Sequence, residues 1–185
     1  MESMVDVAVV GAGPGGSAAA HYLAASGKNV LLLDKSDFPR DKTCGDGLTP
    51  RALDVLRDMN ILDEATQAGF RINGLELHAK GGATMSARVP DHPVYPNHLL
   101  IVPRLKLDDI VRHRAIASGA HFASPVRVQN LKTEKDGVTI FADRDGKPVQ
   151  YRARVAILAI GANMALLKQI GLLKHEPRTI VAVRA

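Results

Sequence analysis

Three glycines and one acid carry the most specific chemistry in this sequence. The glycines, at positions 11, 13 and 16, form a Gly-x-Gly-x-x-Gly pattern directly after an apolar stretch. Gly11 permits a tight turn, Gly13 lets the backbone approach a pyrophosphate, and Gly16 lets a helix pack close to a sheet. Asp34 closes the next apolar stretch and can accept hydrogen bonds from both ribose hydroxyls. The pattern predicts a dinucleotide site, and the carboxylate disfavours the 2′-phosphate of NADP there.

The elements around these residues have the order that such a site requires. The β-branched run over 5–10 predicts a buried strand, and the small residues after the glycines predict a helix over 17–26 that ends at Gly27. A second strand is expected over 29–33. The free N–H groups and the positive dipole end of the helix would then face the phosphates. Because a glycine pattern alone often marks only a turn, this ordering is what makes the prediction specific.

Composition bounds the other function classes. The chain has 185 residues, 46% of them hydrophobic, a formal net charge of +5 and 4% aromatic residues without Trp. It can build a core but lacks the aromatic surface on which nucleic acids stack, so no nucleic-acid partner is expected. One cysteine excludes a disulfide framework, and the seven histidines lack metal-ligand spacing, so no metal site is expected. The densest basic point, Arg112-His113-Arg114, is expected on a solvated helix face.

The ends and the apolar runs bear on location. The first residues lack the charged start and apolar core of a signal peptide. The longest apolar run, over 155–160, is far too short to span a bilayer. We therefore expect a cytoplasmic protein.

The middle of the chain alternates helices with short strands. A long polar loop is expected over 35–48, and Thr49-Pro50 then supplies a helix cap and first turn. A helix over 105–118 places apolar residues on one face and an Asp108–Arg112 pair on the outside. The other elements expected here are helices over 51–59 and 63–68, and strands over 72–79 and 84–89 joined at Gly81-Gly82.

The last third of the chain is rich in β-structure. Asp136-Gly137 and Asp145-Gly146 are hairpin signals that separate three strands of an antiparallel meander. A buried strand over 155–160 follows, and then a short helix through Ile170. The run 179–185 is typical of the start of another strand. The meander strands are expected over 126–133, 138–142 and 149–152.

Three motifs resemble those of one flavoprotein family. Cys44-Gly45-Asp46-Gly47-Leu48, preceded by Arg40 and Lys42, resembles the Cys-Gly-x-Gly loop of the geranylgeranyl reductase family. Arg104-Leu105-Lys106-Leu107-Asp108 resembles that family's arginine and leucine-aspartate helix start, and Leu158 to Asn163 resembles its Ala-Thr-Gly-Ala turn, with Ile160 in place of the small polar residue. The order of elements resembles the aromatic-hydroxylase branch of the glutathione-reductase-type FAD fold.

The resemblance implies a fold and a domain plan. It implies an α/β fold: a Rossmann-like FAD-binding domain with a parallel sheet, an antiparallel β-meander and a β-hairpin inserted from a substrate domain. The Gly-Asp loop that forms the second FAD signature of this fold is missing, so we expect an N-terminal portion of a longer enzyme. The domain segments implied are 1–70 and 99–175 for FAD binding, 71–98 for the substrate-domain hairpin, and 176–185 for the start of a truncated substrate domain.

The resemblance also implies a reaction. FAD is the expected cofactor and NAD(P)H a reductant, for the reduction of carbon–carbon double bonds in an isoprenoid or other hydrophobic small molecule. Such a substrate suggests peripheral membrane association, and the oligomeric state is left open. Two alternatives stand beside this one: a flavin monooxygenase or halogenase of the same fold, and a catalytically silent FAD-binding fragment.

Several residues have two interpretations each. Cys44 is either a small buried hydrophobe or a catalytic thiol beside the flavin. Arg104 is either a surface charge or, because a cation opposes the dipole at a helix start, the partner of an FAD phosphate. Arg40 and Lys42 either solvate the loop or reach the flavin phosphate or ribityl chain. The cofactor-binding residues expected are Gly11, Gly13, Pro14, Gly15, Gly16, Asp34, Lys35, Arg40, Lys42, Cys44, Gly45, Asp46, Gly47, Arg104, Val126, Ala159 and Gly161.

Overall fold

The chain forms two compact units. The computed structural model describes residues 4–162, 164–173, 175 and 177. Unit 1 comprises Met1–Arg40 and Val111–Ala185, and unit 2 comprises Asp41–Ile110. The strand expected at 179–185 lies outside the described residues.

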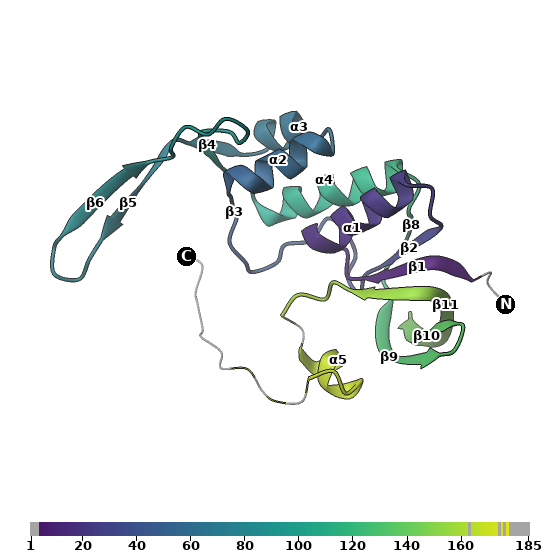
Figure 1. Ribbon diagram of the computed structural model, residues 1–185. Coiled ribbons are helices and arrows are strands. Elements are labelled where there is room, and N and C mark those ends of the chain that lie inside the picture. Colours follow the sequence, from purple (N-terminus) through teal and green to yellow (C-terminus); the bar gives the residue numbers. More distant parts are fainter. Residues whose placement is uncertain (1–3, 163, 174, 176, 178–185) are drawn as a thin grey trace. The chain divides into compact units, whose positions relative to one another are not determined.

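Unit 1 is built on a six-stranded mixed sheet with the order β8-β2-β1-β11-β10-β9 (Figure 1). The neighbours β8, β2, β1 and β11 run parallel, whereas β11, β10 and β9 are antiparallel. This arrangement confirms the predicted α/β fold with a parallel sheet and a meander. The strands are β1 Val5–Val10, β2 Val30–Leu33, β8 His121–Ala123, β9 Arg127–Glu134, β10 Gly137–Arg144 and β11 Lys147–Leu158, and the helices are α1 Pro14–Ala25 and α5 Met164–Gln169.

One long strand, β11, joins the two halves of this sheet. Its first half pairs antiparallel with β10 as far as Ala153, and from Ala153 onward it pairs parallel with β1. The prediction of separate strands over 149–152 and 155–160 was therefore wrong, because no turn-forming residue interrupts the chain between them. Val155 is also 53% exposed, so the second of these segments is less buried than predicted.

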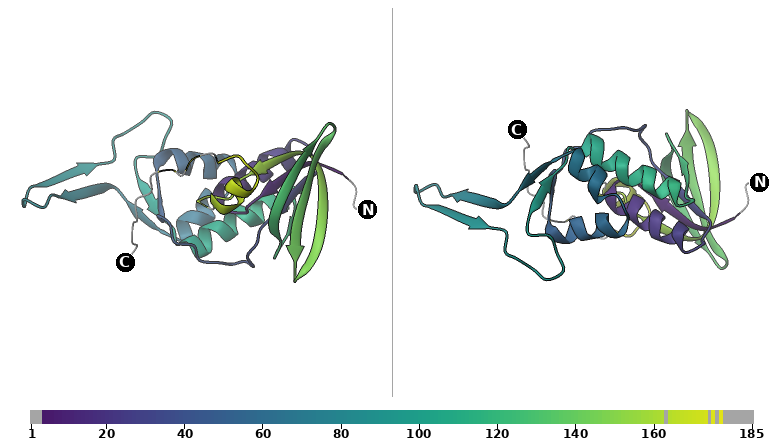
Figure 2. Two further views of the ribbon diagram at one scale, coloured as in Figure 1. Left: turned by 90° about the horizontal axis from the view of Figure 1, so that it is seen from below. Right: turned by 90° about the horizontal axis from the view of Figure 1, so that it is seen from above.

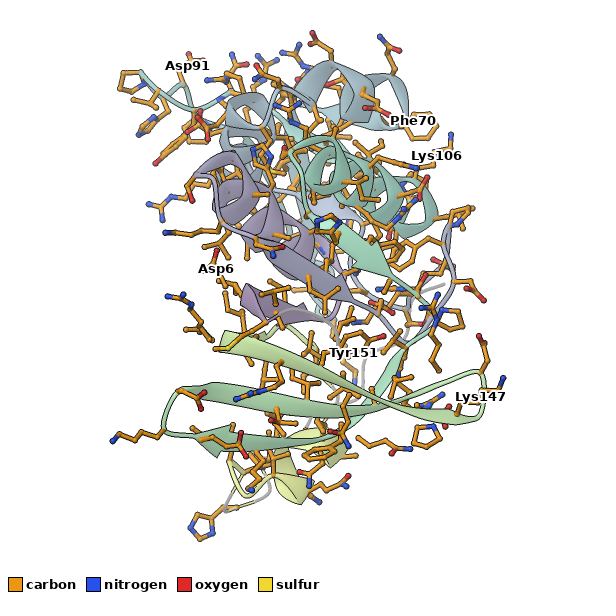
Figure 3. All side chains as sticks on the ribbon, turned by 90° about the vertical axis from the view of Figure 1, so that its right-hand side faces the viewer. Asp6, Phe70, Asp91, Lys106, Lys147 and Tyr151 are labelled. Carbon is orange, nitrogen blue, oxygen red and sulfur yellow. The ribbon has the colours of Figure 1, made fainter. Side chains whose placement is uncertain are left out.

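Both predicted hairpins of the meander form, although the first turn consists of Lys135-Asp136, and Gly137 already pairs with Glu134. At Asp145-Gly146 both residues have positive φ angles, 54° and 76°, which is the geometry that a tight two-residue hairpin turn requires. The curved strands of this meander are green in Figure 2. Lys147 and Tyr151 of β11 are labelled in Figure 3; Lys147 lies beside this turn and is exposed, while Tyr151 is buried.

The two faces of the sheet bury different residues. Val7 and Val9 of β1 belong to one core cluster, and Ala8 between them belongs to the other, as the two-residue period of a strand dictates. The first cluster includes Ala20 and Ala24 of α1, so this small-residue helix packs close to the sheet. The second cluster is Ala8, Leu33, Val126, Ile140, Ala142, Tyr151 and Ala153.

Helix α4, Arg104–Ala117, corrects the sequence prediction at its charged residues. Its predicted apolar face is buried at Leu107, Ile110, Val111 and Ala115. However, Asp108 is fully buried and Arg112 is only 9% exposed, so neither lies on the outside as predicted. Helical periodicity alone assigns charged side chains to the solvent, whereas here paired and ring-contacting groups offset the cost of burial.

Unit 2 combines short strands with two helices. A three-stranded sheet has the order β3-β7-β4, and β5 pairs with β6 as a separate hairpin that projects from β4 (Figure 1). Thr49 caps α2, its hydroxyl accepting the Ala52 N–H at 3.4 Å. None of the described helices is long and apolar enough to cross a membrane. The elements are β3 Gly47–Leu48, α2 Pro50–Asp58, α3 Leu62–Gln67, β4 Phe70–Ile72, β5 Gly74–His78, β6 Thr84–Arg88 and β7 Leu99–Ile101.

Two neighbouring glycines of α1 provide a test of the close helix–sheet packing. A Cβ at Gly16 would overlap the carbonyl oxygen of Gly11, whereas a Cβ at Gly15 would meet no described atom within 4 Å. We expect Gly16→Ala to destabilise the fold by about 2 kcal/mol or more. Gly15→Ala is the control and should leave stability equal or raise it by roughly 0.5 kcal/mol. Thermal unfolding of both variants measures this, and equal midpoints would contradict the packing.

Candidate functional site

The glycine turn of unit 1 links the ends of two parallel strands to α1. Gly11 adopts a φ of 105°, and its N–H donates to the Leu33 carbonyl at 2.7 Å. A Cβ at Gly11 would overlap the Ala159 carbonyl oxygen, while the Ala159 N–H donates to Val10 at 2.8 Å. Position 11 therefore requires glycine for two reasons: its positive φ angle and the close approach of the Ala159 carbonyl, directly after β11. The packing roles predicted for Gly11 and Gly16 are both present.

The amino end of α1 is open. Gly13 occupies the cap position, no side chain caps the helix, no acid lies in the first turn, and Pro14 starts the helix. Arg40 Nη2 lies 3.9 Å from the position of a Cβ on Gly13, and a Cβ on Gly15 would meet no described atom within 4 Å. Helix N-terminal N–H groups without a side-chain cap, together with the positive dipole end, favour an anion. This end of α1 can hold a phosphate group.

Asp34 stands beside this turn with both carboxylate oxygens engaged. Its Oδ2 accepts the Ala12 N–H at 2.7 Å, and its Oδ1 accepts the Ser36 N–H at 2.9 Å. Arg40 Nη2 lies 3.6 Å from Oδ2, and Asp34 is 7% exposed. A carboxylate offers about four lone-pair positions, so capacity remains for further donors such as ribose hydroxyls. The backbone bonds hold this acceptor in a fixed orientation.

The other predicted residues of unit 1 surround the same strand ends. The Val126 N–H donates to the Asp34 carbonyl at 2.7 Å, so β2 is linked to the segment after β8. Ala159 directly follows β11, and Gly161 comes two residues later with a φ of 61°. Lys35 is exposed. The structure thus brings the glycines, Asp34, Arg40, Val126 and Ala159 to neighbouring strand ends.

A second group of predicted residues comes together within unit 2. The pairing of Gly47 with Ile101 sets β3 against β7, and the Val102 N–H donates to the Asp46 carbonyl at 3.0 Å. These contacts hold the loop Cys44–Gly47 beside the chain that leads into Arg104. Cys44 is exposed, so its interpretation as a small buried hydrophobe is wrong. Lys42 is half-buried in the same loop.

Arg104 has its own anion within the fold. Its Nε and Nη2 donate to the two carboxylate oxygens of Asp108 at 2.6 and 2.8 Å, and both side chains are buried. The hydrogen bond to Asp108 is the main cause that raises the pKa of Arg104 above its ordinary value, and the negative charges of Asp108 and Asp46 add to it. The inference that this cation needs an FAD phosphate therefore loses its basis, because Asp108 compensates it.

Sequence reasoning missed some residues of the unit 1 site. The N–H of Ala12 contacts the Asp34 carboxylate, yet a backbone donor leaves no trace in the residue type. Phe38 lies under the Arg40 guanidinium, and Arg112 contacts the same ring; the only available signal was the aromatic residue two positions before Arg40. His21 of α1 is buried, with Nδ1 2.6 Å from Ser118 Oγ. In the part of the chain that the structure describes, no group of three His, Cys, Asp or Glu side chains could hold a metal ion.

This geometry defines unit 1 as a nucleotide-binding α/β unit: an open helix end for phosphate and a fixed carboxylate for ribose. The model of the FAD binding domain family matches residues 4–184, and the chain belongs to this family. The residues present fit FAD, because Gly13 and Gly15 leave the helix end clear and Asp34 retains acceptor capacity. Gly11–Gly16, Asp34 and Arg40 would hold its adenosine diphosphate portion.

Curated relatives extend over the whole chain. The chain is 34% identical to conditioned medium factor receptor 1 of Dictyostelium discoideum (97% of the chain, 38% of the relative). It is 36% identical to menaquinone reductase of Mycobacterium tuberculosis (100% and 44%). It is 29% identical to digeranylgeranylglycerophospholipid reductase 1 of Methanosphaera stadtmanae (96% and 43%). The chain therefore spans less than half the length of these relatives.

Solved structures share the fold. The myxobacterial chondrochloren halogenase CndH superposes with a TM-score of 0.80 at 24% sequence identity, over 90% of this chain and 39% of the halogenase. At this identity the likeness shows the fold alone, and it does not transfer halogenation to this protein.

Neutralising the carboxylate of Asp34 tests the ribose assignment. We expect Asp34→Asn to weaken FAD binding by about tenfold or more, because a charge-assisted acceptor is replaced by an amide. Asp37→Asn, at an exposed acid three residues further on, is the matched control and should bind FAD as the parent does. Fluorescence titration of FAD measures both affinities. Equal affinities would contradict a role for Asp34 in binding the cofactor.

Proposed function

We propose that the protein containing this chain is an FAD-dependent reductase of carbon–carbon double bonds in a hydrophobic, isoprenoid-type substrate. The observation that carries the proposal is the loop Cys44–Gly47, which presents an exposed thiol directly beside the β7–α4 connection. This loop is the motif that resembles the geranylgeranyl reductase family. Two of the relatives, both named as reductases of lipid-type molecules, support the same assignment.

The two units would have different functions: unit 1 would bind the cofactor, and unit 2 would supply the thiol that contacts the ligand. In unit 1 the open end of α1 and the carboxylate of Asp34 would bind and orient the nucleotide portion of the cofactor. Bound FAD would supply two-electron chemistry, for which NAD(P)H is the proposed reductant and an alkene carbon the proposed hydride acceptor. In unit 2 Gly45 and Gly47 flank Asp46 and leave the backbone of the loop free of bulky side chains, so that Cys44 can reach a ligand.

Arg104 and Asp108 would form a rigid support for this loop. Arg104 and Asp108 form a buried bidentate pair within the first turns of α4. The two hydrogen bonds therefore hold the guanidinium in one orientation. The loop is held to the chain just before Arg104 by the pairing of Gly47 with Ile101 and by the Val102 N–H, which donates to the Asp46 carbonyl at 3.0 Å. We therefore assign Arg104 a positioning role for the loop, and Cys44 the contact with flavin or substrate.

The hairpin β5–β6 would supply one wall of the substrate cavity. Leu77 pairs with Met85 and Leu75 pairs with Ala87, so these four side chains share one face of the hairpin. Leu75, Leu77 and Met85 are each more than half exposed. An apolar face of this kind suits an isoprenoid chain, and a substrate of that class would place the protein at a membrane surface.

The reaction is tested with the full-length protein under anaerobic conditions. FAD is reduced with NADPH or dithionite, and a geranylgeranyl lipid is then added. We expect reoxidation of the flavin together with a product that gains two hydrogens for each double bond reduced, measured by mass spectrometry. In a parallel reaction under ¹⁸O₂, a product that incorporates ¹⁸O would contradict the proposal and indicate a monooxygenase.

Cys44→Ser tests the role of the thiol. We expect FAD to stay bound and turnover to fall by about tenfold or more, because a hydroxyl replaces the thiol that contacts the reacting groups. Thr43→Ser, at the preceding exposed position, is the control and should leave turnover unchanged. Unchanged turnover in Cys44→Ser, measured as lipid product per bound FAD, would reject the catalytic role.

A further inference from the structure

Two arginines and two phenylalanines of unit 1 form a cation–aromatic cluster. Arg40 lies over the ring of Phe38, with Cζ 4.8 Å from the ring centroid. Arg112 of α4 lies over the same ring at 5.1 Å and over the ring of Phe122 at 5.0 Å. The two rings meet edge to face with centroids 5.6 Å apart. The four residues come from three separate stretches of the chain: the loop after β2, α4 and β8.

This cation–aromatic cluster restrains the Arg40 side chain. A guanidinium within about 6 Å of an aromatic centroid is attracted by the ring, and more strongly when both are withdrawn from water. Arg40 is 15% exposed and Arg112 is 9% exposed, so both contacts are mostly shielded from solvent. Phe38 and Phe122 also pack against the apolar cluster that contains Val9 and Leu32. The rings are therefore anchored in the core of the sheet.

The restrained guanidinium of Arg40 lies at the nucleotide site. Its Nη2 is 3.6 Å from Asp34 Oδ2 and 3.9 Å from the position of a Cβ on Gly13. A fixed cation at this point adds to the positive end of α1, where the diphosphate of the cofactor would bind. A planar guanidinium can donate to such an anion with two parallel N–H groups, provided that its plane is held in place.

We propose that Arg112 is a positioning residue for cofactor binding. With Phe122 it holds Phe38, and Phe38 in turn fixes the guanidinium of Arg40 beside Gly13 and Asp34 for contact with the FAD diphosphate. This inference rests on FAD binding and not on the substrate, so it stands or falls separately from the proposed reductase activity.

A double-mutant cycle in the full-length protein tests the proposal, with FAD affinity from fluorescence titration as the readout. We expect Arg40→Met to weaken FAD binding about tenfold and Arg112→Met about fivefold. Because Arg112 acts through Arg40, the double variant should bind no more weakly than Arg40→Met alone. Arg112→Lys should bind FAD more tightly than Arg112→Met. The control is Arg114→Met, on the same helix but outside the cation–aromatic cluster, which should bind FAD as the parent does.

The ring provides a second test that does not remove a buried charge. Phe38→Leu should weaken FAD binding as Arg112→Met does, whereas Phe38→Tyr should retain the affinity, and thermal midpoints without FAD check that each variant is folded. Additive losses in the Arg40 and Arg112 double variant would overturn the proposal, because they indicate independent effects. Parental affinity in Arg112→Met or Phe38→Leu would overturn it as well.

Discussion

The hydrogen bond from the Ala12 N–H to the Asp34 carboxylate is the constraint on which the nucleotide site depends. It joins the turn after β1 to the end of β2, two segments that the parallel pairing of these strands has already placed side by side. A buried carboxylate is costly unless it is hydrogen-bonded, and the N–H groups of Ala12 and Ser36 meet that cost. The same bonds fix the acceptor relative to the open end of α1, so that the spacing between acid and helix is set before any ligand binds.

Buried charge recurs along α4, and the helix handles it in two ways. At its start Arg104 and Asp108 form a bidentate pair whose members satisfy each other. One turn beyond Asp108, Arg112 lies against the rings of Phe38 and Phe122. The weakly hydrated, planar guanidinium suits both environments, whereas a lysine would keep the positive charge but not the two-pronged hydrogen bonding. In this family member Arg104 and Arg112 of α4 are thus part of the interior and organise the segments around them.

The fold separates what the family shares from what distinguishes its members. The glycine turn, α1 and Asp34 would bind a nucleotide, a role that is compatible with many reactions. Proteins named as reductases resemble this chain in sequence over nearly its whole length, and a halogenase shares its fold. The loop Cys44–Gly47 and the apolar face of the β5–β6 hairpin belong to unit 2 and offer a more specific chemistry. We therefore propose that unit 2 determines the substrate specificity.

The sequence by itself determined the elements whose signals are local. The strand, glycine turn, second strand and acid over 5–34, the Asp145-Gly146 turn and the apolar face of α4 all follow from periodicity and backbone preference within a few residues. Only the tertiary structure decided that β11 is one strand with two partners, that Asp108 and Arg112 are buried, and that Arg40 lies beside Asp34. These features depend on contacts between residues far apart in the chain. Whether a guanidinium faces water or an aromatic ring depends on which distant segment of the chain packs beside it. The local sequence pattern does not contain that information.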